Sequence, residues 1–178
     1  MTESFLPNVD LQAKNTLAVP SSCRWFKSVT ETSQLFAAVA FARDQGLPLC
    51  ILGSGTNVVL GEFIDALVLQ IALKGRSVVY KDVRSVIIEV GAGEDWHQLV
   101  SWSLEQSFYG LENLALIPGT CGAAPIQNIG AYGVELNDVL DSVEIFDIAE
   151  QKIKRLNAGE CEMAYSCLLY TSPSPRDS

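Results

Sequence analysis

One glycine- and proline-rich segment limits what this chain can fold into more than any other feature of its sequence. Residues 117–133 read IPGTCGAAPIQNIGAYG, with four glycines, two prolines, no charged residue and one aromatic, Tyr132. Glycine lets the backbone approach a ligand closely, whereas proline stiffens the path and removes an N–H donor. Because such a segment makes a poor helix and a poor strand, we predict an irregular loop that wraps a ligand.

The polar side chains of this loop indicate what kind of ligand it wraps. Gln127 and Asn128 bring amide donors and acceptors without a net charge. Paired amides suit the edge of a neutral heterocycle or a polyol chain better than a metal ion or a phosphate. We expect Gly122 and Gly130 to leave space for the ligand that a larger side chain would fill. The predicted ligand is large, flat and only partly anionic.

Size and charge narrow the class of protein further. The chain has 178 residues, a mass of 19.3 kDa and a formal net charge of -9, which fits one ordinary domain or two small lobes. An acidic chain argues against nucleic acid, whose binders gather Lys and Arg on one face. The sequence begins without a signal-peptide pattern, and no stretch stays apolar for the roughly 18 residues that a membrane span needs. We expect a cytoplasmic protein without a membrane or obligate protein partner.

The cysteines and the single histidine carry no recognisable reactive site. The cysteines are odd in number and lack CxxC or Cys/His clustering, which argues against a disulfide framework and against zinc; they are Cys23, Cys50, Cys121, Cys161 and Cys167. His97 could serve as a general acid, but no nucleophile or paired acid lies beside it in the sequence. We expect His97 to have a structural or surface role, and we expect no metal site.

Alternating helical and strand patterns predict an α+β domain. Helical spacing predicts helices over residues 28–46 and 94–107, with Thr32 or Ser33 capping the first and Gly46 ending it. Short β-branched runs predict strands, at residues 47–52, 58–60, 65–71, 77–82 and 85–93, and then a hairpin over 138–156 with its turn at 149–151. Several links between strands are too short to carry a crossover helix, which favours α+β over a doubly wound sheet.

A second glycine-rich turn, GSGTN at residues 53–57, follows the first predicted buried strand. A dinucleotide-binding βαβ unit would need a third small residue and a helix directly after this turn, but Val58 and the residues after it favour a strand. Two glycines instead allow successive N–H groups to point into one anion-binding concavity, and Ser54, Thr56 and Asn57 add side-chain donors. The alternative is a tight turn between two strands.

Together these motifs resemble one family of flavoenzymes. GSGTNVVL at residues 53–60, VGAGEDWHQLV at 90–100 and the stretch from 110 to 136 are similar to the UDP-N-acetylenolpyruvoylglucosamine reductases of bacterial peptidoglycan synthesis. NTLAV at residues 15–19 resembles the family's opening segment, and PIQNIGAYG is similar to its type I branch. The resemblance covers residues 15–165.

The resemblance implies the FAD-binding fold of the vanillyl-alcohol oxidase (PCMH) type, with two α+β lobes that divide near residues 75–85 and clasp an extended FAD. It implies that residues 53–57 bind the pyrophosphate through backbone N–H groups, that residues 118–123 close on it, and that residues 125–132 follow the ribityl chain and the flavin edge. The implied cofactor-binding residues are Gly53, Ser54, Gly55, Thr56, Asn57, Pro118, Gly119, Gly122, Ala123, Pro125, Ile126, Gln127, Asn128, Gly130, Ala131 and Tyr132. Ala123 and Ala124 stand where relatives often carry small hydroxyl residues.

The resemblance also implies a reaction, in which NADPH reduces FAD and the reduced flavin reduces UDP-N-acetylglucosamine enolpyruvate to UDP-N-acetylmuramate. Tyr165 matches a substrate-binding position, but the family's arginine position holds Ser166. Residues 166–178 lose the resemblance and turn Ser/Pro-rich. We expect a non-homologous tail there, with the substrate-binding C-terminal domain and the catalytic Ser and Glu of the family missing. The catalytic residues are therefore unknown, and we expect this chain to be inactive.

Two alternatives stay open at this point. The chain could act as a flavin-binding fragment without turnover, or it could belong to another flavin oxidoreductase of the same fold. A His or Cys placed for covalent attachment of the flavin would favour the second alternative, and the sequence places none convincingly.

Overall fold

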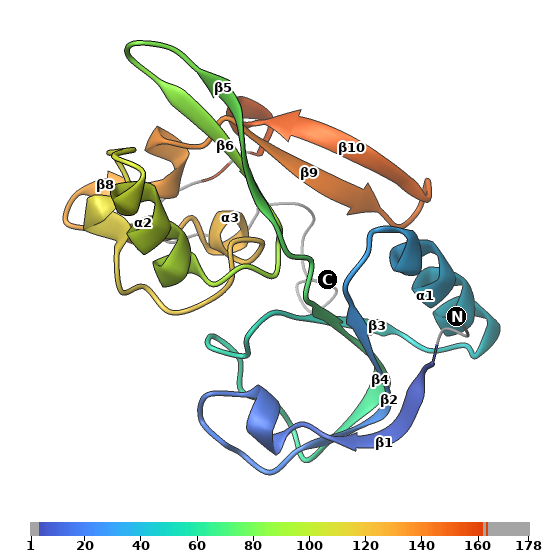
Figure 1. Cartoon of the computed structure of the whole chain (residues 1–178). Coiled ribbons are helices and arrows are strands. Elements are labelled where there is room, and N and C mark those ends of the chain that lie inside the picture. The colour runs from blue at the N-terminus through green and yellow to red at the C-terminus, as the bar shows by residue number, and fades with distance from the viewer. Residues whose placement is uncertain (1–3, 162, 164–178) are drawn as a thin grey trace, which may run out of the picture.

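A four-stranded sheet forms one end of the molecule in the computed structural model, which describes residues 4–161 and 163 (Figure 1). Its strand order is β1-β2-β4-β3, with β2 antiparallel to β1 and parallel to β4, and β3 parallel to β4. The strands are β1 (Leu6–Asp10), β2 (Ser22–Val29), β3 (Leu49–Leu52) and β4 (Phe63–Ile71). The strand expected over residues 47–52 is confirmed, but it lies at the sheet edge, where Ile51 is half exposed.

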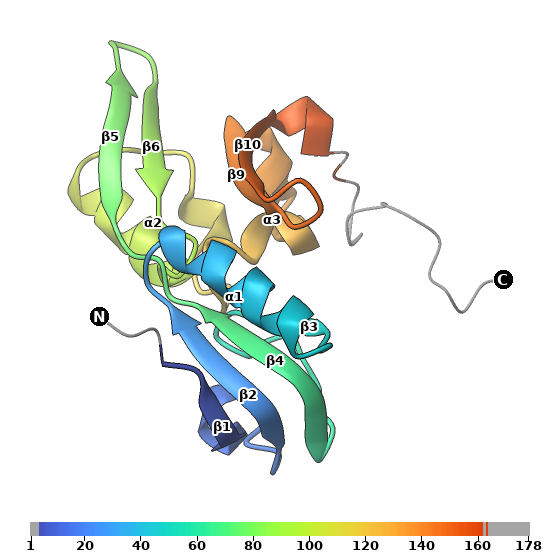
Figure 2. The same ribbon diagram turned by 90° about the vertical axis from the view of Figure 1, so that its right-hand side faces the viewer.

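Successive side chains of β4 point to opposite faces of this sheet, and both faces are apolar. Leu67 and Leu69 pack with Ala38 and Ala42 of helix α1 (Ser33–Asp44), which lies across one face of the sheet (Figure 2). Val68 faces the other side, in a cluster closed by Leu11, Cys23, Phe26 and Leu52. Burial of these aliphatic side chains is what holds the helix and the segment around Leu11 onto the sheet.

Helix α1 begins differently from the sequence expectation. Thr32 occupies the N-cap position, but neither its side chain nor that of Ser33 caps the helix. The side chain of Gln34 reaches back instead, and its Oε1 accepts hydrogen bonds from the N–H of Thr30 at 2.9 Å and of Glu31 at 3.4 Å. The expected stop is confirmed, because Gly46 adopts the left-handed φ of 64° just after the helix.

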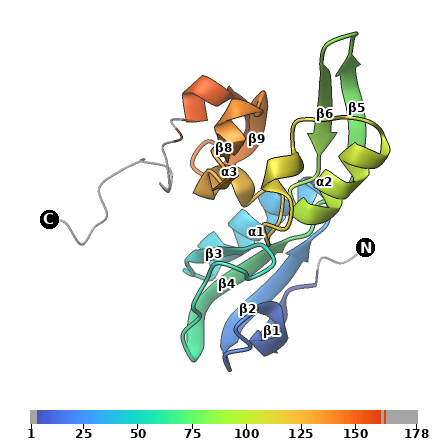
Figure 3. The same ribbon diagram turned by 90° about the vertical axis from the view of Figure 1, so that its left-hand side faces the viewer.

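The second part of the chain packs around helix α2. Hairpin β5 (Arg76–Lys81) and β6 (Val86–Val90) projects away from the four-stranded sheet, and α2 (Trp96–Glu105) lies at its base (Figure 3). A core of buried side chains joins α2 to the segments that follow it, comprising Trp96, Leu99, Val100, Leu114, Ala124 and Leu136. The four-stranded sheet ends at Ile71 and β5 begins at Arg76, while the division of the chain into two lobes near residues 75–85 stays a prediction.

The hairpin expected over residues 138–156 is confirmed. It consists of β9 (Ser142–Asp147) and β10 (Lys152–Asn157), paired from Lys152 opposite Asp147 to Asn157 opposite Ser142, and is followed by the 3₁₀ turn η4 (Ala158–Cys161). Phe146 of β9 meets Phe36 of α1 edge-on, with ring centroids 5.0 Å apart. This aromatic pair brings the late hairpin against the first helix.

Two expectations about local structure were wrong in part. Residues 58–60 form no strand, because β-branched residues favour strands only where a neighbouring strand pairs with them. The loop of residues 117–133 contains a turn of helix α3 (Ala124–Gln127) and a short pairing of β7 (Gly130–Ala131) with β8 (Val134–Glu135). Pro125 lies in the first turn of α3, where a backbone N–H would have no hydrogen-bond partner within the helix, so its absence costs nothing.

The remaining short helices are 3₁₀ turns that connect these elements. They are η1 (Gln12–Lys14), η2 (Glu112–Leu114) and η3 (Leu136–Asp138). Within the described range, the helices are all too short or too polar to cross a membrane.

A single buried hydrogen bond of the α2 core can be tested by substitution. The indole Nε1 of Trp96 donates to the carbonyl of Leu114 at 2.8 Å, and both residues are buried. Trp96→Phe leaves that carbonyl without its donor, so we expect the free energy of unfolding to fall by about 1–3 kcal/mol in urea titrations. Trp102→Phe is the matched control, since the Trp102 ring packs on Phe108. An equal loss in both variants would show that the indole donor contributes nothing.

Candidate functional site

The structure brings the two glycine-rich segments into contact. A Cβ atom added at Gly53 would lie 2.8 Å from the hydroxyl oxygen of Thr120, and one added at Gly119 would lie 3.4 Å from that of Thr56. Residues 53–57 lead from β3 toward β4, whereas residues 118–123 precede α3. Two turns far apart in the sequence therefore form the two sides of one site.

The first turn rests on the chain near the N-terminus. Gly55 has a φ of +73°, and a Cβ at this position would overlap the carbonyl group of Lys14. The carbonyl of Gly55 accepts from the N–H of Thr16 at 3.1 Å and from its hydroxyl at 3.2 Å. Only glycine fits both the backbone conformation and this close approach, so the turn is held rigidly from behind.

Asn15 organises the segment that supports the first turn. Its buried amide Nδ2 donates to the carbonyls of Leu11 at 3.0 Å and Val19 at 3.1 Å, and its Oδ1 accepts from the N–H of Val19 at 3.0 Å. The sequence drew attention to residues 15–19 only through their resemblance to a family segment. A lone Asn gives no signal that it ties a loop together, so this supporting role was missed.

The front of the first turn offers hydrogen-bond donors. Among the described residues, no acceptor is bonded to the backbone N–H groups of Ser54, Gly55, Thr56 or Asn57. The side chains of Ser54 and Asn57 are exposed, and Thr56 is half-buried. Available N–H groups next to a residue with positive φ are the donor set that an anion such as a phosphate requires. The turn thus offers donors to an anionic group.

The second turn is paired with the residues that lead into α2. The N–H of Trp96 donates to the carbonyl of Gly119 at 3.1 Å, Cys121 N–H donates to the carbonyl of Glu94 at 2.8 Å, and Gly122 N–H donates to the carbonyl of Ala92 at 2.8 Å. This strand-like pairing fixes the path of residues 119–122, because three backbone bonds hold four consecutive residues.

The pairing explains why position 122 is a glycine. A Cβ added at Gly122 would lie 2.6 Å from the Cβ of Ala92, so a larger side chain would meet the protein itself, while the assignment of Gly122 to the cofactor stays a prediction. At Gly130 an added Cβ would lie 3.2 Å from the carbonyl oxygen of Val134. Both glycines permit close packing between segments of this chain, which sequence alone could not distinguish from close approach to a ligand.

A pocket lies between the second turn and α3. Its wall is mostly apolar, with Thr120 and Gln127 as polar side chains, and is lined by Trp96, Ile117, Pro118, Gly119, Thr120, Ala123, Ala124, Gln127 and Ile129. Thr120 was absent from the sequence-predicted set although its hydroxyl faces the first turn. Of the predicted residues beyond the pocket, Ile126 is partly exposed and Tyr132 is 88% exposed, whereas Ala131 is half-buried in β7.

The structure separates the two amides that the sequence paired. Gln127 lines the pocket, whereas Asn128 is buried and ends α3 in the left-handed conformation with a φ of 39°. The Nδ2 of Asn128 donates to Glu135 at 2.7 Å, and its Oδ1 accepts from the N–H of Asn137 at 3.3 Å. The Asn128 amide therefore holds the loop to the segment that follows it.

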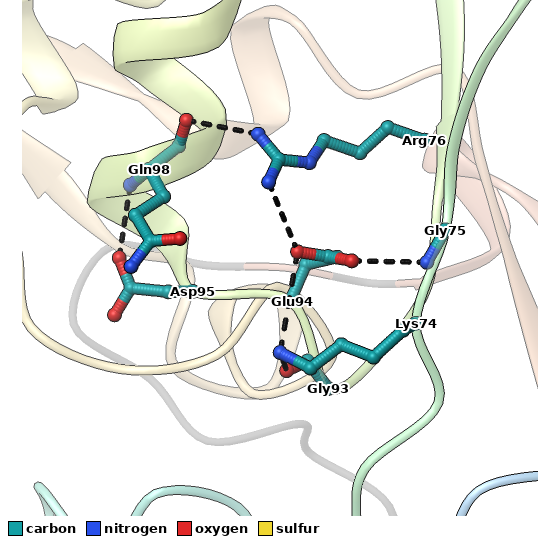
Figure 4. Close-up of polar contacts among 7 residues, drawn as sticks. All are labelled: Lys74, Gly75, Arg76, Gly93, Glu94, Asp95 and Gln98. Atoms are coloured by element: carbon teal, nitrogen blue, oxygen red, sulfur yellow. Dashed lines mark hydrogen bonds and ion pairs between the residues drawn. The ribbon is translucent and has the colours of Figure 1, made fainter.

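A buried carboxylate, that of Glu94, belongs to the segment that pairs with the second turn, and Figure 4 shows its polar contacts. Glu94 accepts from the N–H of Gly75 at 2.9 Å and forms ion pairs with Arg76 at 3.4 Å and Lys74 at 4.0 Å. Its side chain is only 10% exposed. Nearby, burial raises the pKa of Cys121 to about 12, and the negative charges of Glu94 and Asp95 add to this rise.

The other candidate residues have structural roles or lie outside the described residues. The Nδ1 of His97 accepts from the N–H of Leu116 at 3.3 Å, which agrees with the structural role expected for it. Nowhere in residues 4–161 do three or more His, Cys, Asp or Glu side chains gather in a way that could hold a metal ion. Tyr165 and Ser166 lie outside the described residues.

Comparison with known proteins gives this geometry a family context. A family model described as an FAD binding domain matches residues 26–157. The chain is 41% identical to the UDP-N-acetylenolpyruvoylglucosamine reductase of Pseudomonas putida, over 96% of this chain and 50% of that protein. It is 45% identical to the enzyme of the same name from Paraburkholderia phymatum, over 90% of this chain and 46% of that protein. The chain thus spans about half the length of the curated relatives it matches.

Solved structures are similar as well. The UDP-N-acetylenolpyruvylglucosamine reductase of Thermus caldophilus superimposes with a TM-score of 0.69 at 25% identity, over 94% of this chain and 57% of that one. A VAO-type flavoprotein from Myceliophthora thermophila superimposes with a TM-score of 0.52 at 16% identity, over 75% of this chain and 26% of that one. The expected resemblance is confirmed, and the fold is the mixed α/β FAD-binding fold of the VAO type.

The raised pKa of Cys121 predicts a thiol that resists modification. With a pKa of about 12, almost no thiolate exists at pH 8.5, so we expect iodoacetamide to leave Cys121 unmodified in the folded chain and to modify it in urea. Peptide mass spectrometry over time measures both rates. The same shift predicts that the contribution of Cys121 to stability is full below pH 9 and is lost as the pH rises toward about 12. Equal alkylation of Cys121 in folded and unfolded chains would contradict the raised pKa of this partly buried thiol.

Proposed function

Because this chain belongs to the FAD-binding domain family, we propose that residues 53–57 and 118–123 hold the pyrophosphate of FAD between them. The observation that supports this most directly is the contact between the two turns at Gly53 and Thr120. The proposal assigns the pyrophosphate oxygens to the N–H groups of the first turn, which have no acceptor among the described residues.

The rest of the cofactor is proposed to extend from this point along the second turn and α3. Gln127 contributes the polar group of the pocket wall, and Thr120 adds a hydroxyl beside the first turn. The residues proposed to line the ribityl chain and the flavin edge are Pro125, Ile126, Gly130, Ala131 and Tyr132. Asn128 supports this segment through its hydrogen bonds to Glu135 and Asn137.

The reaction proposed for the whole protein follows from its relatives, which are named as reductases. The chemistry that FAD supplies when bound is hydride transfer, placed here between NADPH and the enolpyruvyl double bond of UDP-N-acetylglucosamine enolpyruvate in peptidoglycan synthesis. The described residues of this chain bind and orient the cofactor. Ser166 stands at the family's arginine position, so we propose that the chain as sequenced binds FAD without turning over this substrate.

The visible absorbance spectrum tests both parts of this proposal. We expect the purified chain, titrated with FAD and freed of excess by gel filtration, to retain a flavin spectrum. Under anaerobic conditions with NADPH we expect no reduction of UDP-N-acetylglucosamine enolpyruvate. A folded chain that retains no flavin would refute the cofactor assignment, and turnover of the sugar nucleotide would refute the assignment of this chain as a binding module.

A charge placed on the first turn tests where the pyrophosphate lies. Ser54→Asp and Asn57→Asp each put a carboxylate at an exposed position of this turn, where it would repel a diphosphate by about 1 kcal/mol or more at a partly exposed site. We expect the Kd for FAD to rise about tenfold in the double variant, measured by quenching of flavin fluorescence. Asn8→Asp, on the exposed face of β1, is the matched control. Unchanged affinity in the double variant would place the pyrophosphate elsewhere.

A further inference from the structure

The buried carboxylate of Glu94 and its two basic partners lie outside the residues assigned to the cofactor. Burying a carboxylate costs free energy unless cations and donors compensate it. Here the compensation comes from one short stretch, since Lys74, Gly75 and Arg76 supply two positive charges and a backbone N–H (Figure 4). An apolar side chain at position 94 could be buried without compensating cations. The presence of a charged cluster there therefore needs an explanation.

One side of the cluster is the link between the four-stranded sheet and the β5–β6 hairpin. Backbone bonds fix the start of this link to the sheet, where Ala72 N–H donates to the carbonyl of Val29 at 2.8 Å. The link then bonds to the turn that carries Glu94, through Gly93 N–H to the carbonyl of Leu73 at 2.8 Å. Lys74 also donates to the carbonyl of Gly93.

The other side of the cluster is the second cofactor turn. The backbone carbonyl of Glu94 accepts from Cys121, and its neighbours at positions 92 and 96 bond to Gly122 and Gly119. Arg76 reaches past Glu94 to the carbonyl of Gln98 in α2, at 3.2 Å. The Glu94 side chain therefore bonds to the link while its main chain bonds to the turn that faces Gly53.

We propose that Glu94 is a positioning residue, which fixes the second turn at the distance from the first turn that a dinucleotide diphosphate requires. Glu94 does not touch the cofactor in this proposal. It holds residues 92–96 against residues 72–76, and thereby sets the approach of Thr120 to Gly53 and of Gly119 to Thr56. The inference rests on the proposed function, because it concerns the same pyrophosphate site.

The charge of Glu94 matters for this role as well as its length. A glutamine at this position would accept the N–H of Gly75 but would pair only weakly with Arg76 and Lys74. The two cations would then lose the partner that draws the link onto the turn. An aspartate would keep the charge but would be one methylene too short to reach both Gly75 and Arg76. Both changes are thus expected to loosen the same contact for different reasons.

Affinity for FAD, measured beside stability, tests the proposal. We expect Glu94→Gln to raise the Kd for FAD about tenfold, and Glu94→Asp not to restore it. We also expect a changed visible circular dichroism spectrum of the bound flavin, which a loss of stability alone would not produce. Glu89→Gln removes an exposed carboxylate that is paired with Arg155 and serves as the charge control. Ala42→Gly, in the buried face of α1, serves as a control for lowered stability.

Each outcome decides the matter. Weakened binding in Glu94→Gln, with both controls close to the wild type, supports the positioning role. Wild-type affinity and an unchanged flavin spectrum in Glu94→Gln overturn it. If Glu94→Gln does not fold, Arg76→Lys replaces it, since this variant keeps the charge and shortens the reach to Glu94 and Gln98, and unchanged affinity there also overturns the proposal. A folded wild-type chain that binds no FAD overturns the proposed function itself, which is a different result from an unaffected variant.

Discussion

The close approach of two backbone turns, at Gly53 and Thr120, is the contact on which the rest of this structure depends. A Cβ atom at Gly53 would lie only 2.8 Å from the hydroxyl oxygen of Thr120, so the first turn has no room for a side chain at this position. The four-stranded sheet and α1 hold one turn in place, and the α2 core holds the other. The apolar cores therefore serve to carry two short segments to a fixed separation. The site is a property of how these parts meet, and neither turn forms it alone.

The electrostatics of the molecule fit this arrangement. A chain with a net charge of -9 would repel an anionic ligand if its carboxylates faced the site. The donors at the proposed pyrophosphate site are instead uncharged N–H and hydroxyl groups, which need no counter-ion of their own. The nearest buried carboxylate, Glu94, is matched by Lys74 and Arg76. This local pairing is compatible with an acidic surface around the site proposed for the diphosphate.

The sequence predicted those features that depend on neighbours along the chain. The hairpin over residues 138–156 and the stop at Gly46 follow from local spacing and from glycine, and both are confirmed. Features that depend on distant partners were not predictable in this way. The use of Gly122 against Ala92 arises where separate segments meet. The strand prediction for residues 58–60 was wrong, because a β-branched pattern does not show whether a partner strand lies beside it.

The parallel pairing of β3 with β4 limits how this chain can vary in length. Two parallel neighbours need a crossover connection, and here residues 53–62 provide it without a helix, with the first turn at its start. An insertion or deletion in that crossover would move the turn off the Lys14 carbonyl that supports it. The tip of the β5–β6 hairpin, where Val83 is fully exposed, has no such attachment. Homologous chains should therefore differ in length at the hairpin tip and keep the crossover constant.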